Sequence, residues 1–319
     1  MIPHELSPRS ILLPEGEASI VIMTCRELRS ERFALRLQQE FGTLVKGWFV
    51  YTPTQHASVP DSRTKPAASE SESRLSRLRR MGFQELARKS LGWAKRKLGG
   101  IIRRVRGNPE AQKKKASQTL WEETERHLFE MEVERLRKYQ VVDPESVSDP
   151  NSEEFVSRVR EIDPYFFLSL GGPLYGKQLL ATARGIALNQ HAGWSPDHRG
   201  SGTVHWALYH RDLLKVGSTV HVTSSGADAG PIVRRGQTGI VPWDTAESMF
   251  LRTVALGTEL MCEVVHDAMT MRQLTVFDQP PYSGKTYTYP ELTPDIVRSI
   301  EQDIEAGWLV REMRRLRSF

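Results

Sequence analysis

The sequence predicts an α/β fold built on a mostly parallel sheet. Two features support this prediction: a strand–helix–strand pattern near the N-terminus and three further strand-like segments later in the chain. Apolar runs at 20–23 and 44–51 flank a segment, 31–41, whose apolar residues recur every three or four positions, as on one face of a helix. A strand, a helix and a strand joined by a short return loop are the usual opening of a parallel sheet. Further strands are expected at 165–170, 185–189 and 218–224.

The rest of the chain is expected to alternate helices and loops around these strands. Residues 142–152 are rich in Asp, Pro and Ser and are expected to form a loop. The tail is expected to hold a hairpin-like segment at 274–289 and a helical one at 294–317. We therefore divide the chain into a main domain, 1–265, and a C-terminal hairpin and helix, 266–319. Helices are expected at 121–139, 153–160, 177–183 and 245–266.

Composition places the chain among ordinary globular enzymes. It has 319 residues, of which 39% are hydrophobic and 26% charged. No apolar run approaches the roughly 20 residues of a membrane-spanning helix, and the first ten residues do not form a secretory signal. Only Cys25 and Cys262 are present, which excludes a disulfide framework and favours a reducing, cytoplasmic location.

The charge of the chain is concentrated in one segment. Residues 62–115 contain 17 Lys or Arg and 4 Asp or Glu, whereas the remainder contains 27 basic and 35 acidic residues. We interpret 57–118 as a basic insertion in the main domain, either disordered and solvated or helical. A basic amphipathic helix, with Trp93 among its apolar residues, would bind an anionic membrane surface or RNA, giving a location peripheral to the membrane.

Three polar residues are expected to meet at one edge of the sheet. Asn189 and His191 end a predicted strand, and Asp228 lies in a Gly-rich loop after the next one. Ligands bind at the carboxyl ends of strands in open parallel sheets. An Asn amide can stabilise the oxyanion of an acyl transfer, a His can transfer protons, and an Asp can orient the His. No covalent nucleophile is needed where an amine substrate attacks.

These residues also resemble the signature of a known family. Asn189, His191, Pro196 and Gly200 follow the Asn-x-His-x4-Pro-x3-Gly pattern of the folate-dependent formyltransferases, and Asp228 follows at the family's distance. That family includes methionyl-tRNA formyltransferase and sugar N-formyltransferases. The resemblance extends over roughly 18–52 and 120–290. It implies a Rossmann-like domain in which an Asn, His and Asp triad is catalytic.

The resemblance further implies the substrates and the residues that bind them. The formyl donor would be 10-formyltetrahydrofolate. The acceptor would be a primary amine of a small molecule, such as an amino sugar or a related metabolite. A nucleotide-linked amino sugar belongs to this class of acceptors. The folate would contact a loop that matches Leu170, Gly171, Gly172 and Leu174, together with Gly226 of the Asp228 loop. One departure is Trp194, which we expect to reshape the wall beside His191. The 91 residues after Asp228 are fewer than a methionyl-tRNA enzyme with its C-terminal barrel would need.

Two other functions are also compatible with the sequence. The first is hydrolysis of 10-formyltetrahydrofolate, in which water replaces the amine. The second is a non-catalytic protein that binds RNA or a membrane on a formyltransferase fold, which the basic insertion would favour. His198, His205 and His210 lack the Cys or carboxylate partners of a closed metal site, so no metal is expected.

Overall fold

The computed structural model describes residues 6–53, 109–280 and 284–317, with the backbone alone for 109–120 and 317. The chain divides into two compact units, one formed by 1–54 with 121–319 and the other by 55–120. The predictions for the basic segment 62–115 concern the second unit and lie outside the described residues, except for a helical backbone over its last residues.

A mixed sheet forms the centre of the first unit. Among the described residues it has nine strands in the order β1-β10-β9-β8-β6-β5-β2-β3-β4, and a separate two-stranded sheet pairs β11 with β7. The strands are β1 (Pro8–Leu12), β2 (Ile20–Thr24), β3 (Val45–Tyr51), β4 (Pro144–Val147), β5 (Phe166–Leu170), β6 (Ile186–His191), β7 (His198–Gly200), β8 (Gly217–Val222), β9 (Ile232–Gln237), β10 (Gln273–Phe277) and β11 (Lys285–Tyr287).

The large sheet has a parallel half and an antiparallel half. Strands β4, β3, β2, β5 and β6 run parallel, and β8, β9, β10 and β1 continue the sheet from β6 through antiparallel pairs. Helices alternate with the parallel strands, which confirms the predicted α/β class. The direction of the strands reverses between β6 and β8. Ligands in open α/β sheets bind outside the carboxyl ends of the parallel strands, and β6 contributes such an end beside this junction.

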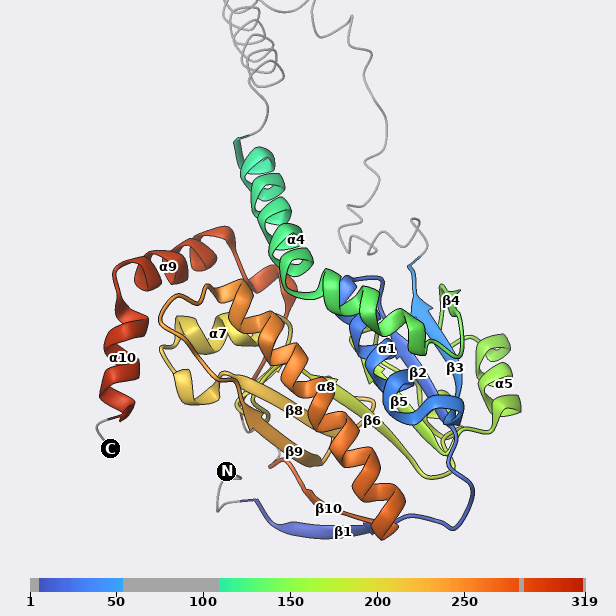
Figure 1. Cartoon of the computed structure of the whole chain (residues 1–319). Helices are drawn as coiled ribbons and strands as arrows, with labels where there is room; N and C mark the ends of the chain where they lie inside the picture. The colour runs from blue at the N-terminus through green and yellow to red at the C-terminus, as the bar shows by residue number, and fades with distance from the viewer. Residues whose placement is uncertain (1–5, 54–108, 281–283, 318–319) are drawn as a thin grey trace, which may run out of the picture. The chain divides into compact units, whose positions relative to one another are not determined.

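Helices cover both faces of the parallel half (Figure 1). Alternate residues of a strand face opposite sides, and β2 shows this directly. Ile22 packs in the cluster that contains α1 and α8, whereas Val21 and Met23 pack in the cluster that contains α5 and α6. The helices are α1 (Leu28–Phe41), α4 (Pro109–Leu136), α5 (Glu153–Ile162), α6 (Lys177–Leu180), α7 (Thr203–Tyr209), α8 (Ala246–Met271), α9 (Pro294–Glu305) and α10 (Trp308–Arg317).

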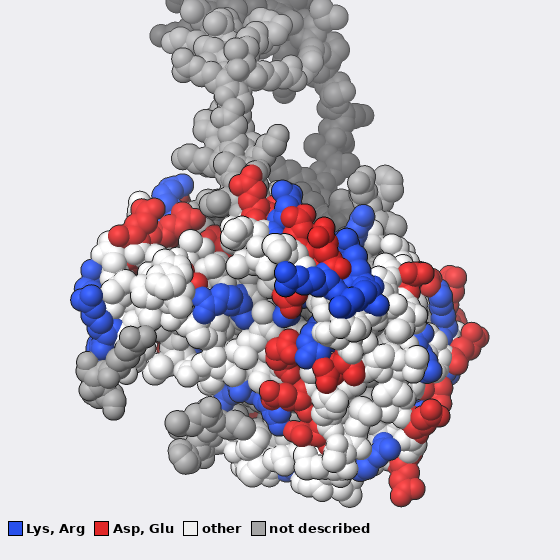
Figure 2. Space-filling model, in the orientation of Figure 1, with Lys and Arg blue, Asp and Glu red and all other residues white. Residues whose placement is uncertain are grey.

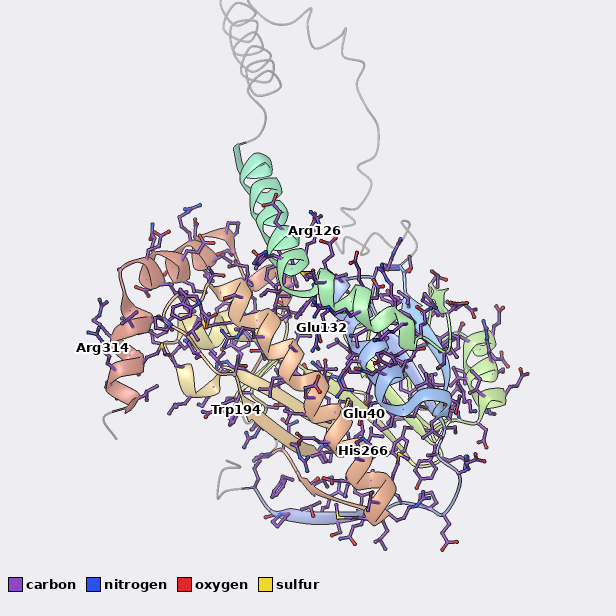
Figure 3. The ribbon with its side chains drawn as sticks, in the orientation of Figure 1. Glu40, Arg126, Glu132, Trp194, His266 and Arg314 are labelled. Atoms are coloured by element: carbon purple, nitrogen blue, oxygen red, sulfur yellow. The ribbon has the colours of Figure 1, made fainter. Side chains whose placement is uncertain are left out.

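Ion pairs join α1 to α8 across the surface of the sheet. His266 of α8 lies 2.7 Å from Glu40 of α1, and both are labelled in Figure 3. Arg36 of α1 contacts Glu40 at 2.6 Å and Glu259 of α8 at 2.9 Å. Figure 2 shows acidic and basic side chains intermixed on this face. Exposed pairs of this kind each stabilise a fold by about 0 to 1 kcal/mol, so the packed core dominates.

The structure corrects the sequence predictions at two places. Residues 144–147, expected to be loop, form the edge strand β4 beside β3. The expected hairpin at 274–289 is not formed, because β10 joins β1 and β9 in the large sheet while β11 pairs in parallel with β7. Helix α8 also runs without a break across residue 265. The tail forms α9 and α10, as predicted for 294–317.

Among the described residues, no helix combines the length and apolar character needed to cross a membrane.

Candidate functional site

Asn189 and His191 lie at the carboxyl end of β6, where the two halves of the sheet meet. They are two positions apart on one strand, so their side chains project from the same face. Asn189 is paired in register with Ser169 of β5 and with His221 of β8. The Ser169 hydroxyl donates to Asn189 Oδ1 at 2.9 Å, and Asn189 Nδ2 lies 3.1 Å from His221 Nε2. These two neighbours fix the orientation of the amide.

Asp228 reaches this face from the turn that follows β8. Its Oδ2 lies 3.3 Å from His191 Nδ1 and accepts a 2.8 Å hydrogen bond from the Gly200 backbone N–H. Its Oδ1 lies 3.4 Å from Asn189 Nδ2. The structure therefore brings together the three residues that the sequence pattern selected. Asp228 also has a left-handed backbone, with φ of 48°, which costs a non-glycine residue about 1 to 3 kcal/mol.

The surroundings of Asp228 keep its carboxyl group ionised. Burial alone would raise the pKa of this carboxyl, but the nearby His191 and the hydrogen bond from His221 favour the charged form. The Gly200 N–H acts in the same direction, and the net result is a pKa well below the usual range. Asp228 is therefore a carboxylate throughout the neutral pH range.

His191 has an acceptor facing each of its ring nitrogens. Nε2 lies 3.0 Å from the His198 carbonyl oxygen, which can only accept a hydrogen bond. Nδ1 faces the Asp228 carboxylate, which also only accepts. Because only 7% of the His191 side chain is exposed, these two contacts dominate its surroundings. The arrangement suits a group that donates a proton.

The sequence analysis missed His221, which completes the cluster. His221 Nε2 lies 3.3 Å from Asp228 Oδ1, and His221 Nδ1 lies 2.9 Å from the Val222 carbonyl oxygen. The Val222 carbonyl only accepts, so it places a proton on His221 Nδ1, while Nε2 lies within reach of both Asp228 Oδ1 and the Asn189 amide. A buried His within a predicted strand is a signal that the sequence does contain, although it reveals no partner.

The residues expected to bind folate lie in two loops near the cluster. Leu170 ends β5, in register with Gln190 of β6. Gly171 and Gly172 follow with φ of 70° and 101°, so both positions require a left-handed backbone. Leu174, in the same loop, is 58% exposed. The loop is braced by the Tyr175 hydroxyl, which donates to the Gly171 carbonyl at 2.8 Å.

Gly226 lies in the Asp228 loop, two residues before Asp228. Its carbonyl oxygen accepts hydrogen bonds from the Ala229 backbone N–H at 3.4 Å and from the Ser224 hydroxyl at 3.3 Å. Gly226 is thus part of the turn that presents the carboxylate. Its role as a folate contact stays a prediction.

Trp194 lies in the segment between His191 and His198. Its ring is buried, with the Arg235 guanidinium 4.5 Å above it, and is labelled in Figure 3. Arg235 Nη1 also donates to the Ser195 carbonyl at 2.6 Å, and the Trp194 carbonyl accepts from the His198 backbone N–H at 2.9 Å. Trp194 therefore helps to fold the segment that carries the His198 carbonyl to His191.

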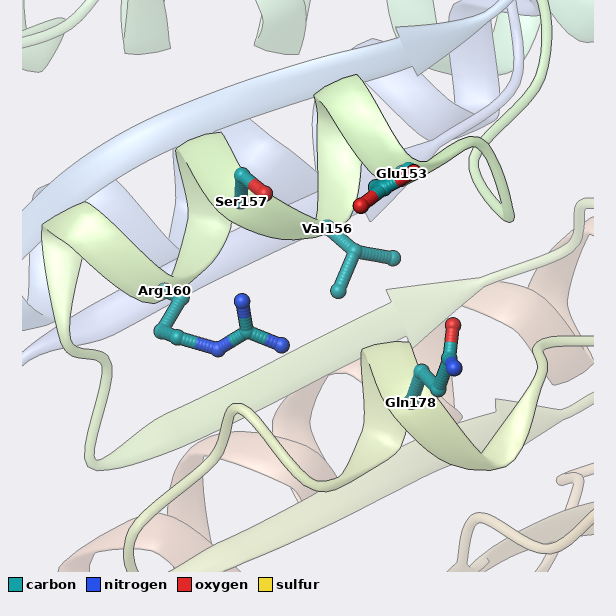
Figure 4. A pocket seen from close by; sticks show the side chains of 5 residues that line it. All are labelled: Glu153, Val156, Ser157, Arg160 and Gln178. Carbon is teal, nitrogen blue, oxygen red and sulfur yellow. The ribbon is translucent and has the colours of Figure 1, made fainter.

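Two further observations bear on ligands. An open depression of about 300 Å³ lies on α5 and α6, between Arg160 and Gln178, and none of the cluster residues lines it (Figure 4). Among the described residues, no group of three or more His, Cys, Asp or Glu side chains is arranged to hold a metal ion.

Comparison with known families assigns the chain to a class. The model of the formyl transferase family matches residues 106–265, half of the chain, and this range contains Asn189, His191, His221 and Asp228. The chain belongs to the formyl transferase family.

Curated relatives match a similar region. The chain is 28% identical over 153 residues to a methionyl-tRNA formyltransferase from Thermodesulfovibrio yellowstonii, a match that covers 48% of this chain and 47% of that protein. It is 24% identical over 181 residues to a methionyl-tRNA formyltransferase from Levilactobacillus brevis, covering 56% and 55%. The chain thus spans about half the length of these two curated relatives.

Solved structures of similar proteins include two formyltransferases. One is a 4-N formyltransferase from Francisella tularensis, with 11% identity, a TM-score of 0.47 and coverage of 86% of this chain and 78% of that one. The other is a phosphoribosylglycinamide formyltransferase from Bacillus halodurans, with 16% identity, a TM-score of 0.45 and coverage of 79% and 96%.

Proposed function

We propose that this protein transfers a formyl group from 10-formyltetrahydrofolate to a primary amine of a small acceptor, such as an amino sugar or a related metabolite. The observation that carries the proposal is that Asp228 contacts both His191, at 3.3 Å, and Asn189, at 3.4 Å, in a chain of the formyl transferase family. An amide donor, an imidazole with two acceptors and a carboxylate are the groups that acyl transfer to an amine requires.

The proposed reaction proceeds through a tetrahedral intermediate. The neutral amine forms a bond to the formyl carbon, and the carbonyl π electrons move onto the formyl oxygen. Asn189 Nδ2 exchanges its 3.4 Å contact with Asp228 Oδ1 for a hydrogen bond to that oxyanion, and a donor of this kind typically accelerates such steps by about 100- to 1000-fold. The intermediate collapses by breaking the bond between the formyl carbon and N10. His191 gives a proton to N10, and the proton lost by the amine returns to the His191 and Asp228 pair.

Asp228 has two roles in this scheme. Its carboxylate lies 3.3 Å from His191 Nδ1 and orients the imidazole ring. It also accepts the Gly200 N–H, which fixes the carboxylate relative to the ring. We assign folate contact to Leu170, Gly171, Gly172, Leu174 and Gly226, because the loops that contain them adjoin the cluster.

The test is a transfer assay with several amines. Purified protein is mixed with 10-formyltetrahydrofolate and candidate acceptors, including nucleotide-linked amino sugars, and tetrahydrofolate and N-formyl product are followed by mass spectrometry. We expect product to appear only with an amine, and only in wild type and not in His191→Ala. Formate released at the same rate without any amine would instead identify a hydrolase and overturn the proposal.

A further inference from the structure

The Asp228 carboxylate is held by a turn that is difficult to form. Its left-handed backbone is costly for most residues other than Gly, Asn and Asp, and the turn also approaches β8 closely. A Cβ atom placed on Gly230 would lie 1.7 Å from the Val222 carbonyl oxygen. A small rotation of this turn would move the carboxylate away from His191. Some part of the fold outside the turn must therefore hold its backbone.

Gln279 supplies that support from a distant part of the sequence. Its Nε2 donates to the Asp228 carbonyl oxygen at 2.7 Å and to the Gly230 carbonyl oxygen at 2.6 Å. An amide NH2 has two hydrogens, so both are used. The two partners are separated from Gln279 by 51 and 49 residues. Gln279 thus joins the tail of the chain to the turn that presents the carboxylate.

The identity of the facing atoms fixes the orientation of the Gln279 amide. Both are carbonyl oxygens, which only accept, so the NH2 group must face the turn and Oε1 must face away. Gln279 follows β10, whose Phe277 is paired with Ile232 at the start of β9. The strand pairing holds Gln279 beside the turn, and a Glu at this position would place a carboxylate against two carbonyl oxygens.

We propose that Gln279 is a positioning residue of the reaction: by bonding both ends of the Asp228 turn, it keeps the carboxylate in contact with His191 and with the Gly200 N–H. In the proposed formyl transfer, Gln279 contacts no reacting group and acts only through Asp228. The proposal rests on the function proposed above, since the consequence for turnover presumes formyl transfer. Its geometric part, the placement of Asp228, can be measured without any substrate.

The variants to compare are Gln279→Met and Gln279→Glu, with Gln273→Glu as the matched control. Met keeps the length of the side chain but removes both donors, and Glu adds repulsion. Gln273 lies at the start of the same β10 strand, is exposed and bonds the Ser10 hydroxyl at 2.9 Å. It carries the same chemical change without any contact to the site. Circular dichroism confirms that each variant is folded.

The first measurement is hydrogen exchange at the Gly200 amide, whose N–H is bonded to Asp228 Oδ2 at 2.8 Å. We expect faster exchange at Gly200 in Gln279→Met, because the carboxylate leaves the amide, and wild-type exchange in Gln273→Glu. Unchanged exchange at Gly200 in both Gln279 variants overturns the proposal. This outcome does not depend on whether the protein transfers formyl groups.

The second measurement is kinetic and separates positioning from a general structural role. We expect kcat to fall by about 10- to 100-fold in Gln279→Met, since a misplacement of about 1 Å typically costs a factor of this size, with KM for the folate nearly unchanged. In an Asp228→Asn background, Gln279→Met should cause no further loss, because both changes act at one contact. Effects that multiply in the double variant contradict action through Asp228.

If wild type transfers no formyl group while exchange at Gly200 responds as expected, the proposed function fails and the role of Gln279 in placing Asp228 stands.

Discussion

The two halves of the large sheet perform different tasks. In the parallel half, helices cover both faces, and residues such as Phe167 and Leu168 are fully buried on opposite sides of one strand. In the antiparallel half, α8 covers one face, whereas the other carries polar side chains that include Thr219, His221 and Arg235. The candidate site lies where the halves meet. The parallel half therefore holds most of the helix-covered core, whereas the site combines Asn189 and His191 from β6, at the edge of that half, with His221 and Asp228 from the antiparallel side.

The largest effects are expected at the junction between the halves. Asn189→Ala should lower kcat by about 100- to 1000-fold through loss of the oxyanion donor, and His191→Ala by at least as much. Each variant should melt within a few degrees of wild type, because the backbone of β6 stays paired on both sides. The measurement is kcat beside a thermal melt. A variant that retains more than about a tenth of wild-type activity would remove that residue from the site.

The parallel half should respond in the opposite way. Phe167 is fully buried, and Phe167→Ala should lower the free energy of unfolding by about 3 to 5 kcal/mol, because it leaves a cavity. Turnover of the fraction that remains folded should change little. Leu12→Ala on β1 is the matched control, since Leu12 is 76% exposed. Denaturant unfolding measures both, and equal losses in the two variants would contradict the assigned roles.

His221 tests the antiparallel half directly. His221→Asn removes the ring that lies 3.1 Å from Asn189 Nδ2 and 3.3 Å from Asp228 Oδ1, so both partners lose part of their orientation. We expect kcat to fall about tenfold with KM nearly constant. His266→Asn is the control, because His266 pairs with Glu40 on the helical surface. Steady-state kinetics measures kcat and KM of both variants. A wild-type kcat in His221→Asn would show that His221 is not part of the site formed by Asn189, His191 and Asp228.

The smallest expected effect concerns stability and pH. The pKa of Asp228 is lowered by folding, so its carboxylate stabilises the fold above its unfolded pKa of about 3.9, and this contribution is lost as pH falls through the folded value. Asp228→Asn keeps a residue that tolerates a positive φ. We expect the free energy of unfolding of wild type to exceed that of Asp228→Asn by about 1 to 3 kcal/mol at pH 7. Unfolding experiments should show a constant difference from pH 7 down to about 4 and a shrinking one below it, and a difference that grows there would reverse the sign.

Sequence alone predicted the parts of the fold that have local signals. The apolar runs located β2, β3, β5, β6 and β8, and the spacing of Asn189, His191 and Asp228 selected residues that the structure brings together. Residues 144–147 were missed because an edge strand of four residues with Pro and Glu shows no apolar alternation. The expected hairpin was wrong because β11 pairs with β7, whose residues lie far back in the chain.

The parts of the site that the sequence did not reveal depend on long-range contacts. Gln279 contacts the turn around Asp228 across about fifty residues, and no periodicity or spacing reports such a bond. Arg235 from β9 covers the ring of Trp194, and no pattern in the sequence indicates this contact. Side chains that act through tertiary partners become visible only once the strands are placed.

If Asn189, His191 and Asp228 form the reaction centre, the one-carbon unit of the folate must bind beside them. The decisive measurement is a crystal structure with a stable 10-formylfolate analogue, in which the distance from the formyl oxygen to Asn189 Nδ2 is read. We predict about 3 Å, with His191 and Asp228 still paired beside the formyl carbon. A bound analogue whose formyl group lies outside hydrogen-bonding reach of all three residues would contradict the assignment of the site.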